Sequence, residues 1–225
     1  GVTGSGKTEI YFEAINEVLK QGKQSLVLLP EIALTNVLVS RIEDRFGSKP
    51  AIWHSSMMAS ERSNVWKEIV NGNAKLVVGA RSALFLPFKD LGLIIVDEEH
   101  DASYKQTEKV IYNARDMAIS RASFEKITVI LASATPSLET LLNAKEGKYR
   151  RLRIKERVGP AILPEVSTID MRQENIDKGR WISPTLQKKI MQTLRNEEQV
   201  LLFLNRRGYA PLTLCRKCGH RIDCR

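Results

Sequence analysis

The chain has 225 residues, of which 43% are hydrophobic and 27% are charged, and this suits a globular protein of one or two domains. No apolar run approaches the roughly 20 residues of a membrane span, and no signal peptide opens the chain, so we expect a cytoplasmic protein without a membrane partner. The net charge of +9 lies wholly in residues 145–225, which carry 19 Lys/Arg against 9 Asp/Glu; this predicts a polyanionic partner such as nucleic acid, or else a solvated basic linker.

Short apolar strands alternate with amphipathic helices over the first two thirds of the chain. In chain order, we expect a helix at 8–21, a strand at 25–29, a helix at 34–46, a strand at 51–53, a helix at 60–71, strands at 76–78, 93–96 and 129–132, and a helix at 137–144. The strands are continuously apolar, which is typical of strands buried on both faces. The pattern therefore predicts an α/β fold, a parallel sheet with helices on both faces.

A basic segment rich in Gly and Pro interrupts this alternation, and we interpret residues 150–164 as a linker. Residues 1–149 would then form a first lobe, and residues 165–225 the start of a second. The elements expected in the second lobe are a strand at 166–170, a helix opened by Ser183 and Pro184, and a strand at 200–204.

Residues 1–8 read Gly-Val-Thr-Gly-Ser-Gly-Lys-Thr, a complete phosphate-binding P-loop. Lys7 would reach the β- and γ-phosphates of ATP, and the Thr8 hydroxyl would ligate Mg²⁺. Backbone N–H groups of the loop would point at the phosphates, so the predicted nucleotide-binding residues here are Gly1, Gly4, Ser5, Gly6, Lys7 and Thr8. Because a P-loop normally follows a buried strand and none precedes Gly1, we expect the sequence to be an internal piece of a larger protein.

The second half of a nucleotide site is expected at the carboxyl end of the fourth predicted strand, where ligands of parallel sheets bind. Asp97 emerges there and would hold Mg²⁺, partly through water. Glu98 is placed to orient or deprotonate the attacking water, so the predicted catalytic residues are Lys7, Asp97 and Glu98. We expect Glu99 to be a solvated loop carboxylate without a chemical role, and His100 to border the nucleotide and link its site to the second domain.

Two hydroxyl residues, Ser133 and Thr135, follow the last apolar strand of the first lobe. In this order, the P-loop, the Asp-Glu-Glu-His box at 97–100 and the Ser-Ala-Thr string resemble motifs I, II and III of superfamily 2 helicases. Residues 28–35 and 79–85 resemble motifs Ia and Ib. The likeness is closer still to the replication restart helicases of the primosome, through the strings at 97–101, 103–106, 112–116, 205–211 and 215–224.

The resemblance implies an ATP-dependent DNA helicase that moves 3′ to 5′, acts on single-stranded and forked DNA, and works with primosome and replication restart proteins. It implies two RecA-like lobes, of which this chain holds the first and the start of the second, with a zinc-binding insertion in the second. Motif III, here Ser133 to Thr135, would couple hydrolysis to lobe motion. Thr35 and Arg81 would contact the DNA backbone, with a surface ion pair as the alternative role of Arg81.

In the family, an aromatic-rich loop that senses single-stranded DNA follows motif II. Tyr104 and Tyr112 keep its aromatic character here, whereas Val110 stands where the family has tryptophan. Stacking of a base on an aromatic ring contributes ~1–3 kcal/mol. This departure therefore predicts weaker coupling between DNA binding and hydrolysis, or coupling carried by Tyr112 and Arg115.

The three cysteines, Cys215, Cys218 and Cys224, cluster near the end of the chain, which argues for a metal site and against disulfides. Cys215 and Cys218 form a knuckle that presents two thiolates to one Zn²⁺, and His220 would complete the set only in a strained geometry. The resemblance implies instead two zinc ions, with Cys215 and Cys218 at one and Cys224 at the other, each completed by cysteines beyond this sequence, so that both sites are expected to be incomplete here. Free surface thiols are the remaining alternative.

Two other functions fit the same residues. One is a non-catalytic nucleotide- or DNA-binding remnant of such a helicase, because an arginine supplied across the site is worth on the order of 10³–10⁵ in rate and the family's arginine lies beyond this sequence. We therefore expect ATP turnover near background from this piece alone. The other is a P-loop kinase or transporter ATPase, against which the Asp-Glu-Glu-His box and the Ser-Ala-Thr strand end argue.

Overall fold

The computed structural model describes residues 6–30, 36–154, 164–174 and 182–203. The chain divides into two compact units, Gly1–Ile162 and Leu163–Arg225. The finer division into lobe, basic linker and second lobe stays a prediction. Among the helices of the described residues, none is both long and apolar enough to cross a membrane.

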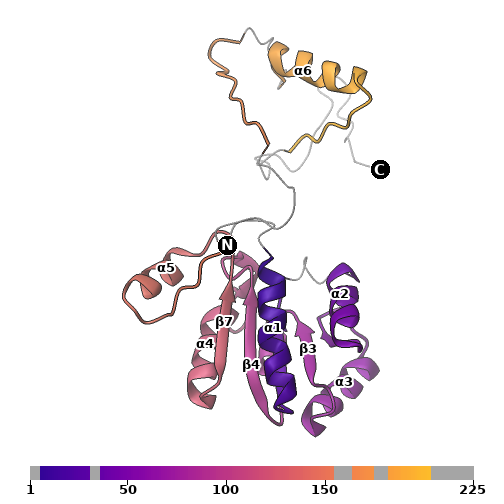
Figure 1. Cartoon of the computed structure of the whole chain (residues 1–225), viewed down its shortest axis with the longest axis vertical. Helices are drawn as coiled ribbons and strands as arrows, with labels where there is room; N and C mark the ends of the chain where they lie inside the picture. Colours follow the sequence, from indigo (N-terminus) through magenta and orange to yellow (C-terminus); the bar gives the residue numbers. More distant parts are fainter. Residues whose placement is uncertain (1–5, 31–35, 155–163, 175–181, 204–225) are drawn as a thin grey trace. The chain divides into compact units, whose positions relative to one another are not determined.

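The first unit is built on a five-stranded sheet whose neighbouring strands are all parallel (Figure 1). Its order is β2-β3-β1-β4-β7, with β2 at Ala51–Trp53, β3 at Leu76–Gly79, β1 at Gln24–Leu28, β4 at Leu91–Asp97 and β7 at Thr128–Ala132. The predicted strands of this unit are all found, each within two residues of its expected ends. β1 and β3 are buried at every residue, whereas β7 lies at the edge of the sheet and is half-exposed.

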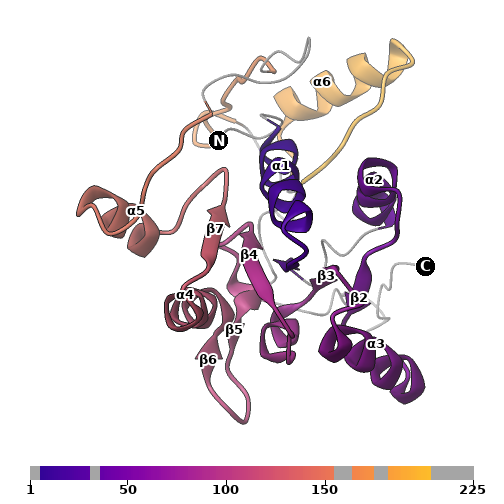
Figure 2. The same ribbon diagram turned by 60° about the horizontal axis from the view of Figure 1, so that its bottom comes forward.

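Helices cover both faces of the sheet, which confirms the predicted fold class. The helices of this unit are α1 Lys7–Lys20, α2 Asn36–Phe46, α3 Ala59–Asn71, α4 Ala114–Glu125 and α5 Leu138–Lys145. On one face, Phe12 of α1 and Ile42 of α2 pack in one cluster with Ile95. On the other, Ile69 of α3 and Ala118 of α4 share a cluster with the alternate residues of the strands. Figure 2 separates the two pairs, with α1 and α2 on one side of the strands and α3 and α4 on the other.

The region between β3 and β7 holds elements that the apolar pattern does not predict. They are the 3₁₀-helices η2 Arg81–Phe85 and η3 Ala102–Tyr104, the antiparallel pair β5 Lys105–Gln106 and β6 Tyr112–Asn113, and α4. The buried side of α4 is formed largely by Ala114, Ala118 and Ala122. Because alanine is only weakly apolar, such a helix leaves no row of large residues in the sequence.

The second unit holds one helix within its described residues, α6 at Pro184–Arg195. Ser183 caps it as predicted, and its Oγ accepts a hydrogen bond from Leu186 N at 3.2 Å. The strand predicted at 166–170 is wrong, and residues 200–203 of the other predicted strand carry no strand either. Val166 is 83% exposed, so the apolar run has no sheet to pack against among the described residues.

Candidate nucleotide site

The site begins at the amino end of α1. Gly6 caps this helix with a left-handed backbone, φ 78°, which a side chain would strain. Its carbonyl accepts hydrogen bonds from Glu9 N at 3.0 Å and Ile10 N at 3.3 Å. Lys7 and Thr8 therefore lie in the first helical turn, at the positive end of the helix dipole. The other predicted P-loop residues, Gly1, Gly4 and Ser5, lie outside the described residues.

Asp97 ends β4 and contacts α1. Its Oδ1 accepts a hydrogen bond from Glu98 N at 3.0 Å, and its Oδ2 accepts one from the Tyr11 hydroxyl at 3.3 Å. Burial raises the pKa of Asp97 above its ordinary value, and burial together with Asp97 raises the pKa of Tyr11. The carboxylate is thus tied to the P-loop helix in a partly dry position where its charge is incompletely compensated.

Lys7 and Glu98 meet directly across the site, with Lys7 Nζ 2.8 Å from Glu98 Oε1. Glu98 has φ 46°, in the left-handed region that residues other than glycine seldom adopt. Its carbonyl accepts a hydrogen bond from Asp101 N at 2.8 Å, which closes a turn directly after the strand. Two of the three predicted catalytic side chains are therefore brought into contact, and the third, Asp97, is adjacent in the chain.

His100 bridges the Asp-Glu-Glu-His box and the Ser-Ala-Thr string. Its Nδ1 lies 2.7 Å from Ser133 Oγ, and its Nε2 lies 3.3 Å from Thr135 Oγ1. The same Ser133 Oγ accepts a hydrogen bond from Thr135 N at 3.0 Å. The same His100 Nδ1 is also 3.5 Å from Glu98 Oε2. A polar path therefore runs from Lys7 through Glu98 and His100 to the end of β7.

The prediction that Glu99 is a solvated carboxylate is wrong. The residue is only 2% exposed. Its Oε1 accepts a hydrogen bond from Ser137 N at 2.7 Å, and its Oε2 accepts from Ser137 Oγ at 3.0 Å, Thr140 Oγ1 at 3.1 Å and Arg115 Nη1 at 3.3 Å. A charge at the end of an apolar strand is normally solvated, but here the amino end of α5 and the guanidinium of α4 enclose it. The sequence signal for this partner is Arg115 in the first turn of α4, but the apolar pattern does not predict α4.

The residues predicted to contact or sense DNA have different surroundings. The ring of Tyr104 is buried and its hydroxyl reaches Leu28 O at 2.9 Å and Asp97 O at 2.5 Å, so in this conformation it anchors η3 and is closed to base stacking. The ring of Tyr112 is half-buried and packs edge-on against Phe85, with centroids 5.2 Å apart. Arg81 Nη1 donates to Ser103 O at 3.2 Å.

Besides Gly1, Gly4 and Ser5, four more of the predicted site residues lie outside the described residues, namely Thr35, Cys215, Cys218 and Cys224. Within the described ranges, no group of three or more His, Cys, Asp and Glu side chains is arranged to hold a metal ion. The predictions of a DNA contact at Thr35 and of zinc sites at the cysteines therefore stay predictions.

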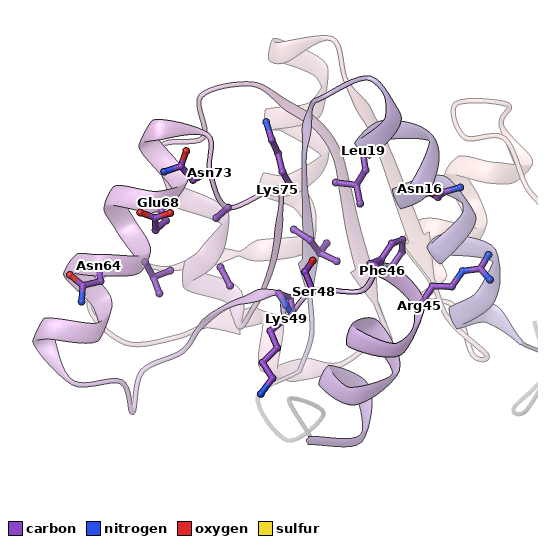
Figure 3. Close-up of a pocket in the computed structure, with 15 residues that line it drawn as sticks. Asn16, Leu19, Arg45, Phe46, Ser48, Lys49, Asn64, Glu68, Asn73 and Lys75 are labelled. Carbon is purple, nitrogen blue, oxygen red and sulfur yellow. The ribbon is translucent and has the colours of Figure 1, made fainter.

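A pocket of about 650 Å³ lies at the amino ends of β2 and β3 (Figure 3). Among its lining residues are Arg45 and Phe46 of α2, Glu68 of α3 and Lys75 beside β3. None of the predicted site residues lines it, and it is at the opposite end of the parallel strands from Asp97. It is therefore separate from the nucleotide site.

The donors available for a metal at the nucleotide site fit Mg²⁺. Asp97 supplies a carboxylate and Thr8 a hydroxyl, both of them oxygen ligands. The burial that raises the pKa of Asp97 is the expected surrounding of a carboxylate whose charge a divalent cation would compensate.

The comparisons with known proteins agree with this geometry. The family model described as DEAD/DEAH box helicase matches residues 1–144. The replication restart protein PriA of Rickettsia felis is 51% identical over 225 residues, which is all of this chain and 35% of the relative. The PriA of Bacillus subtilis is 48% identical over 225 residues, again all of this chain and 28% of the relative. The chain thus spans about a third of the length of these curated relatives.

Among solved structures, that of the DUF1998 helicase MrfA bound to DNA and AMPPNP is 19% identical, with a TM-score of 0.50 over 71% of this chain and 24% of that chain. At this identity the likeness concerns the fold alone, and it agrees with a RecA-like lobe built on a parallel sheet. The family model covers well over half of the chain, so the chain belongs to the DEAD/DEAH box helicase family.

Proposed function

We propose that the chain is part of the motor of an ATP-dependent DNA helicase that acts in replication restart. The observation that carries the proposal is the convergence of Lys7, Asp97 and Glu98 at the carboxyl end of β4. It is supported by the match of the whole chain to PriA proteins at 48–51% identity. Those relatives are longer than this chain, so unwinding, its 3′-to-5′ direction and its partners are proposed for a protein of that length.

The site residues would act on ATP in separate roles. Lys7 would leave Glu98 and move onto the β- and γ-phosphates, which releases the Glu98 carboxylate to orient the attacking water. Thr8 and Asp97 would hold Mg²⁺, which compensates the phosphate charge when bound. Because Lys7 already lies within reach of Glu98, one movement of the lysine both binds the phosphate and frees the carboxylate.

The histidine bridge would carry the state of the site to the end of β7. His100 Nδ1 lies near both Glu98 Oε2 and Ser133 Oγ, and its Nε2 lies near Thr135 Oγ1. A change in the protonation or position of Glu98 would therefore alter the hydrogen bonds of both hydroxyl residues. We propose that this path couples hydrolysis to motion of the segment that follows Thr135.

DNA is the proposed substrate, in single-stranded and forked form. The basic last third of the sequence suits a phosphate backbone. The solved structure of MrfA, with which the chain shares a fold, holds DNA and AMPPNP together. Thr35 and Arg81 are the proposed backbone contacts and Tyr112 the proposed aromatic sensor. Arg115 is buried, so we place it in the coupling path and away from the DNA itself.

We also propose zinc binding by the cysteine cluster, with Cys215 and Cys218 at one ion and Cys224 at another, as the family resemblance implies. Primosome and replication restart proteins are the proposed partners, and the cytoplasm is the proposed compartment. Zinc content, measured in a protein of the relatives' length beside its Cys218→Ser variant, tests the zinc proposal: the variant should retain less zinc.

The function can be tested in a chimera in which these 225 residues replace the aligned segment of Bacillus subtilis PriA, a relative that matches the whole of this chain. The chimera should unwind forked DNA and partial duplexes with a 3′ tail when ATP is present, and should leave duplexes with a 5′ tail intact. Lys7→Ala within the chimera should abolish unwinding. A folded chimera that binds DNA or nucleotide and hydrolyses no ATP would favour the non-catalytic alternative instead.

A further inference from the structure

Glu99, Arg115, Ser137 and Thr140, here called the Glu99 cluster, join three elements that lie far apart in the sequence. Glu99 follows β4, Arg115 lies in the first turn of α4, and Ser137 caps α5. Both carboxylate oxygens are occupied, since Oε1 accepts from Ser137 N and Oε2 accepts from two hydroxyls and the guanidinium. Arg115 Nη1 also donates to Ser137 Oγ at 2.7 Å, which closes the cluster on itself.

On its inner side, the Glu99 cluster is joined to the nucleotide site by one peptide bond. Glu98 precedes Glu99 and has the left-handed torsion φ 46°. Glu99 N donates to Ala132 O at 3.1 Å, which holds this turn against β7. When Lys7 leaves Glu98, the Glu98 side chain loses its partner at 2.8 Å, and any rotation of this strained turn moves the carboxylate of Glu99 as well.

On its outer side, the Glu99 cluster reaches two exposed segments. Asn113 ends β6 and caps α4, with its Oδ1 accepting from Arg115 N at 3.0 Å, so the backbone of Arg115 is held at the base of the β5–β6 hairpin. Beside this hairpin lies the ring of Phe85, which is 55% exposed. Ser137 begins α5, which follows the segment bonded to His100. A displacement of the Glu99 carboxylate would therefore move both Arg115 at the β5–β6 hairpin and Ser137 at α5.

We propose that Glu99 is a positioning residue that couples the occupied nucleotide site to the β5–β6 hairpin through Arg115 and to α5 through Ser137. This deepens the proposed function and rests on nucleotide binding at that site. The Glu99 carboxylate accepts its hydrogen bonds from Ser137, Thr140 and Arg115 and contacts none of the side chains of Lys7, Thr8 and Asp97, so its replacement should leave nucleotide affinity intact while both outer segments stop responding. The coupling requires the charge, because only a carboxylate can accept from all four donors at once.

The test compares Glu99→Gln with Glu139→Gln in the 225-residue chain. Glu139 is a matched control, since its Oε2 lies 3.8 Å from the same Arg115 Nη1 but its side chain is 71% exposed. Amide hydrogen exchange is followed for residues 105–116 and 136–142, with and without AMPPNP and Mg²⁺. In the wild type and in Glu139→Gln, the nucleotide should change exchange in both segments by about twofold or more. In Glu99→Gln that change should vanish, while the Kd for a fluorescent ATP analogue stays within about threefold of wild type.

The outcomes separate the inference from the function on which it rests. A wild type that binds no nucleotide would overturn the proposed function and this inference together. Two other outcomes would overturn the inference alone. In one, the wild type binds nucleotide and Glu99→Gln shows the same change of exchange; in the other, the wild type binds nucleotide and its exchange does not change. Should Glu99→Gln fold poorly, Glu99→Gln combined with Arg115→Met removes both buried charges and should recover stability. The double variant should still show no change of exchange on nucleotide binding, and a double variant that does show this change would contradict the proposal.

Discussion

Asp97, Glu98 and Glu99 follow one another in the chain but have three different surroundings. Asp97 is half-buried beneath the Tyr11 hydroxyl, Glu98 reaches Lys7, and Glu99 is enclosed by donors from α4 and α5. The three carboxylates differ in how deeply they are buried and in which groups neutralise their charge. Asp97 is therefore suited to bind a metal, Glu98 to orient water and Glu99 to position neighbouring elements. Function at this strand end is therefore decided by the partners of each residue more than by the residue type.

Asp97→Asn should stabilise the chain in the absence of nucleotide and abolish its Mg²⁺-dependent binding of nucleotide. Burial raises the pKa of Asp97, which means that the charged form is disfavoured in the folded chain. Removing the charge should raise the free energy of unfolding at pH 7, as measured by urea denaturation.

The sign of the pH dependence follows from the same shift. The folded chain holds the Asp97 proton more tightly than the unfolded chain, in which the carboxyl has its ordinary pKa of 3.8. The charged Asp97 carboxylate therefore lowers the stability of the folded chain at neutral pH. The advantage of Asp97→Asn should shrink as the pH is lowered from 7 toward 4. Asp44→Asn, on the exposed surface of α2, should be close to neutral throughout, and an equal gain there would contradict the account.

Tyr104→Phe tests the assignment of this residue as a buried anchor. The hydroxyl contacts Leu28 O and Asp97 O, so its removal should cost about 1–2 kcal/mol in the free energy of unfolding. Tyr112→Phe should change stability little, because the ring contact with Phe85 does not involve the hydroxyl. If the two variants were equally stable, the anchoring role would be wrong.

At the scale of the elements, the sheet and its covering helices could be predicted because each strand is a continuous apolar run followed by a glycine, a proline or a polar turn. α4 could not be predicted in this way, since its buried face is built on Ala114, Ala118 and Ala122. The error at Glu99 has the same origin, because the partner that neutralises it, Arg115, lies on that helix. A site residue can be recognised from sequence only when the element that faces it is also recognised.

The second unit shows the opposite error. The apolar runs at 166–170 and 200–204 have strand composition, yet the described residues of both carry no strand. Strand propensity expresses how well a side chain packs on a half-buried sheet, and Val166 and Phe203 are largely exposed. Without neighbouring strands among the described residues, composition by itself does not decide the structure.

Gln24 joins several of these elements at the start of β1. Its Nε2 donates to Ile69 O at 3.0 Å and Ala74 O at 2.8 Å, and its Oε1 accepts from Lys89 N at 2.8 Å and Asp90 N at 3.1 Å. One buried amide thus satisfies backbone groups at the end of α3 and before β4.

Gln24→Leu should therefore lower the free energy of unfolding by about 2–4 kcal/mol, because four hydrogen bonds to backbone groups are lost. Urea denaturation measures this loss. Gln21→Leu at the exposed end of α1 is the matched control and should change stability by less than about 0.5 kcal/mol. Comparable losses in both variants would mean that Gln24 does not hold these elements together.

At the scale of the whole molecule, the acidic and basic residues are separated along the chain. Residues 1–144, which the helicase family model matches, are nearly neutral with 16 Lys/Arg against 17 Asp/Glu, and the basic excess lies after them. The chemistry of the nucleotide and the attraction for a polyanion are thus assigned to different stretches. In the proposed motor the two would communicate, and the proposed coupling through His100 and the Glu99 cluster would start at the nucleotide site.

The central claim is that Lys7, at the amino end of α1, belongs to a working ATP site with Asp97 and Glu98. The most direct measurement is the Kd of a fluorescent ATP analogue with Mg²⁺ for the wild type, Lys7→Ala and Lys20→Ala. Lys20 lies on the same helix and pairs with Glu17 at 2.7 Å in an exposed position, so it controls for the loss of one lysine and one ion pair. We predict that Lys7→Ala weakens binding about tenfold or more while Lys20→Ala binds like the wild type. Equal affinity in all three would contradict the account.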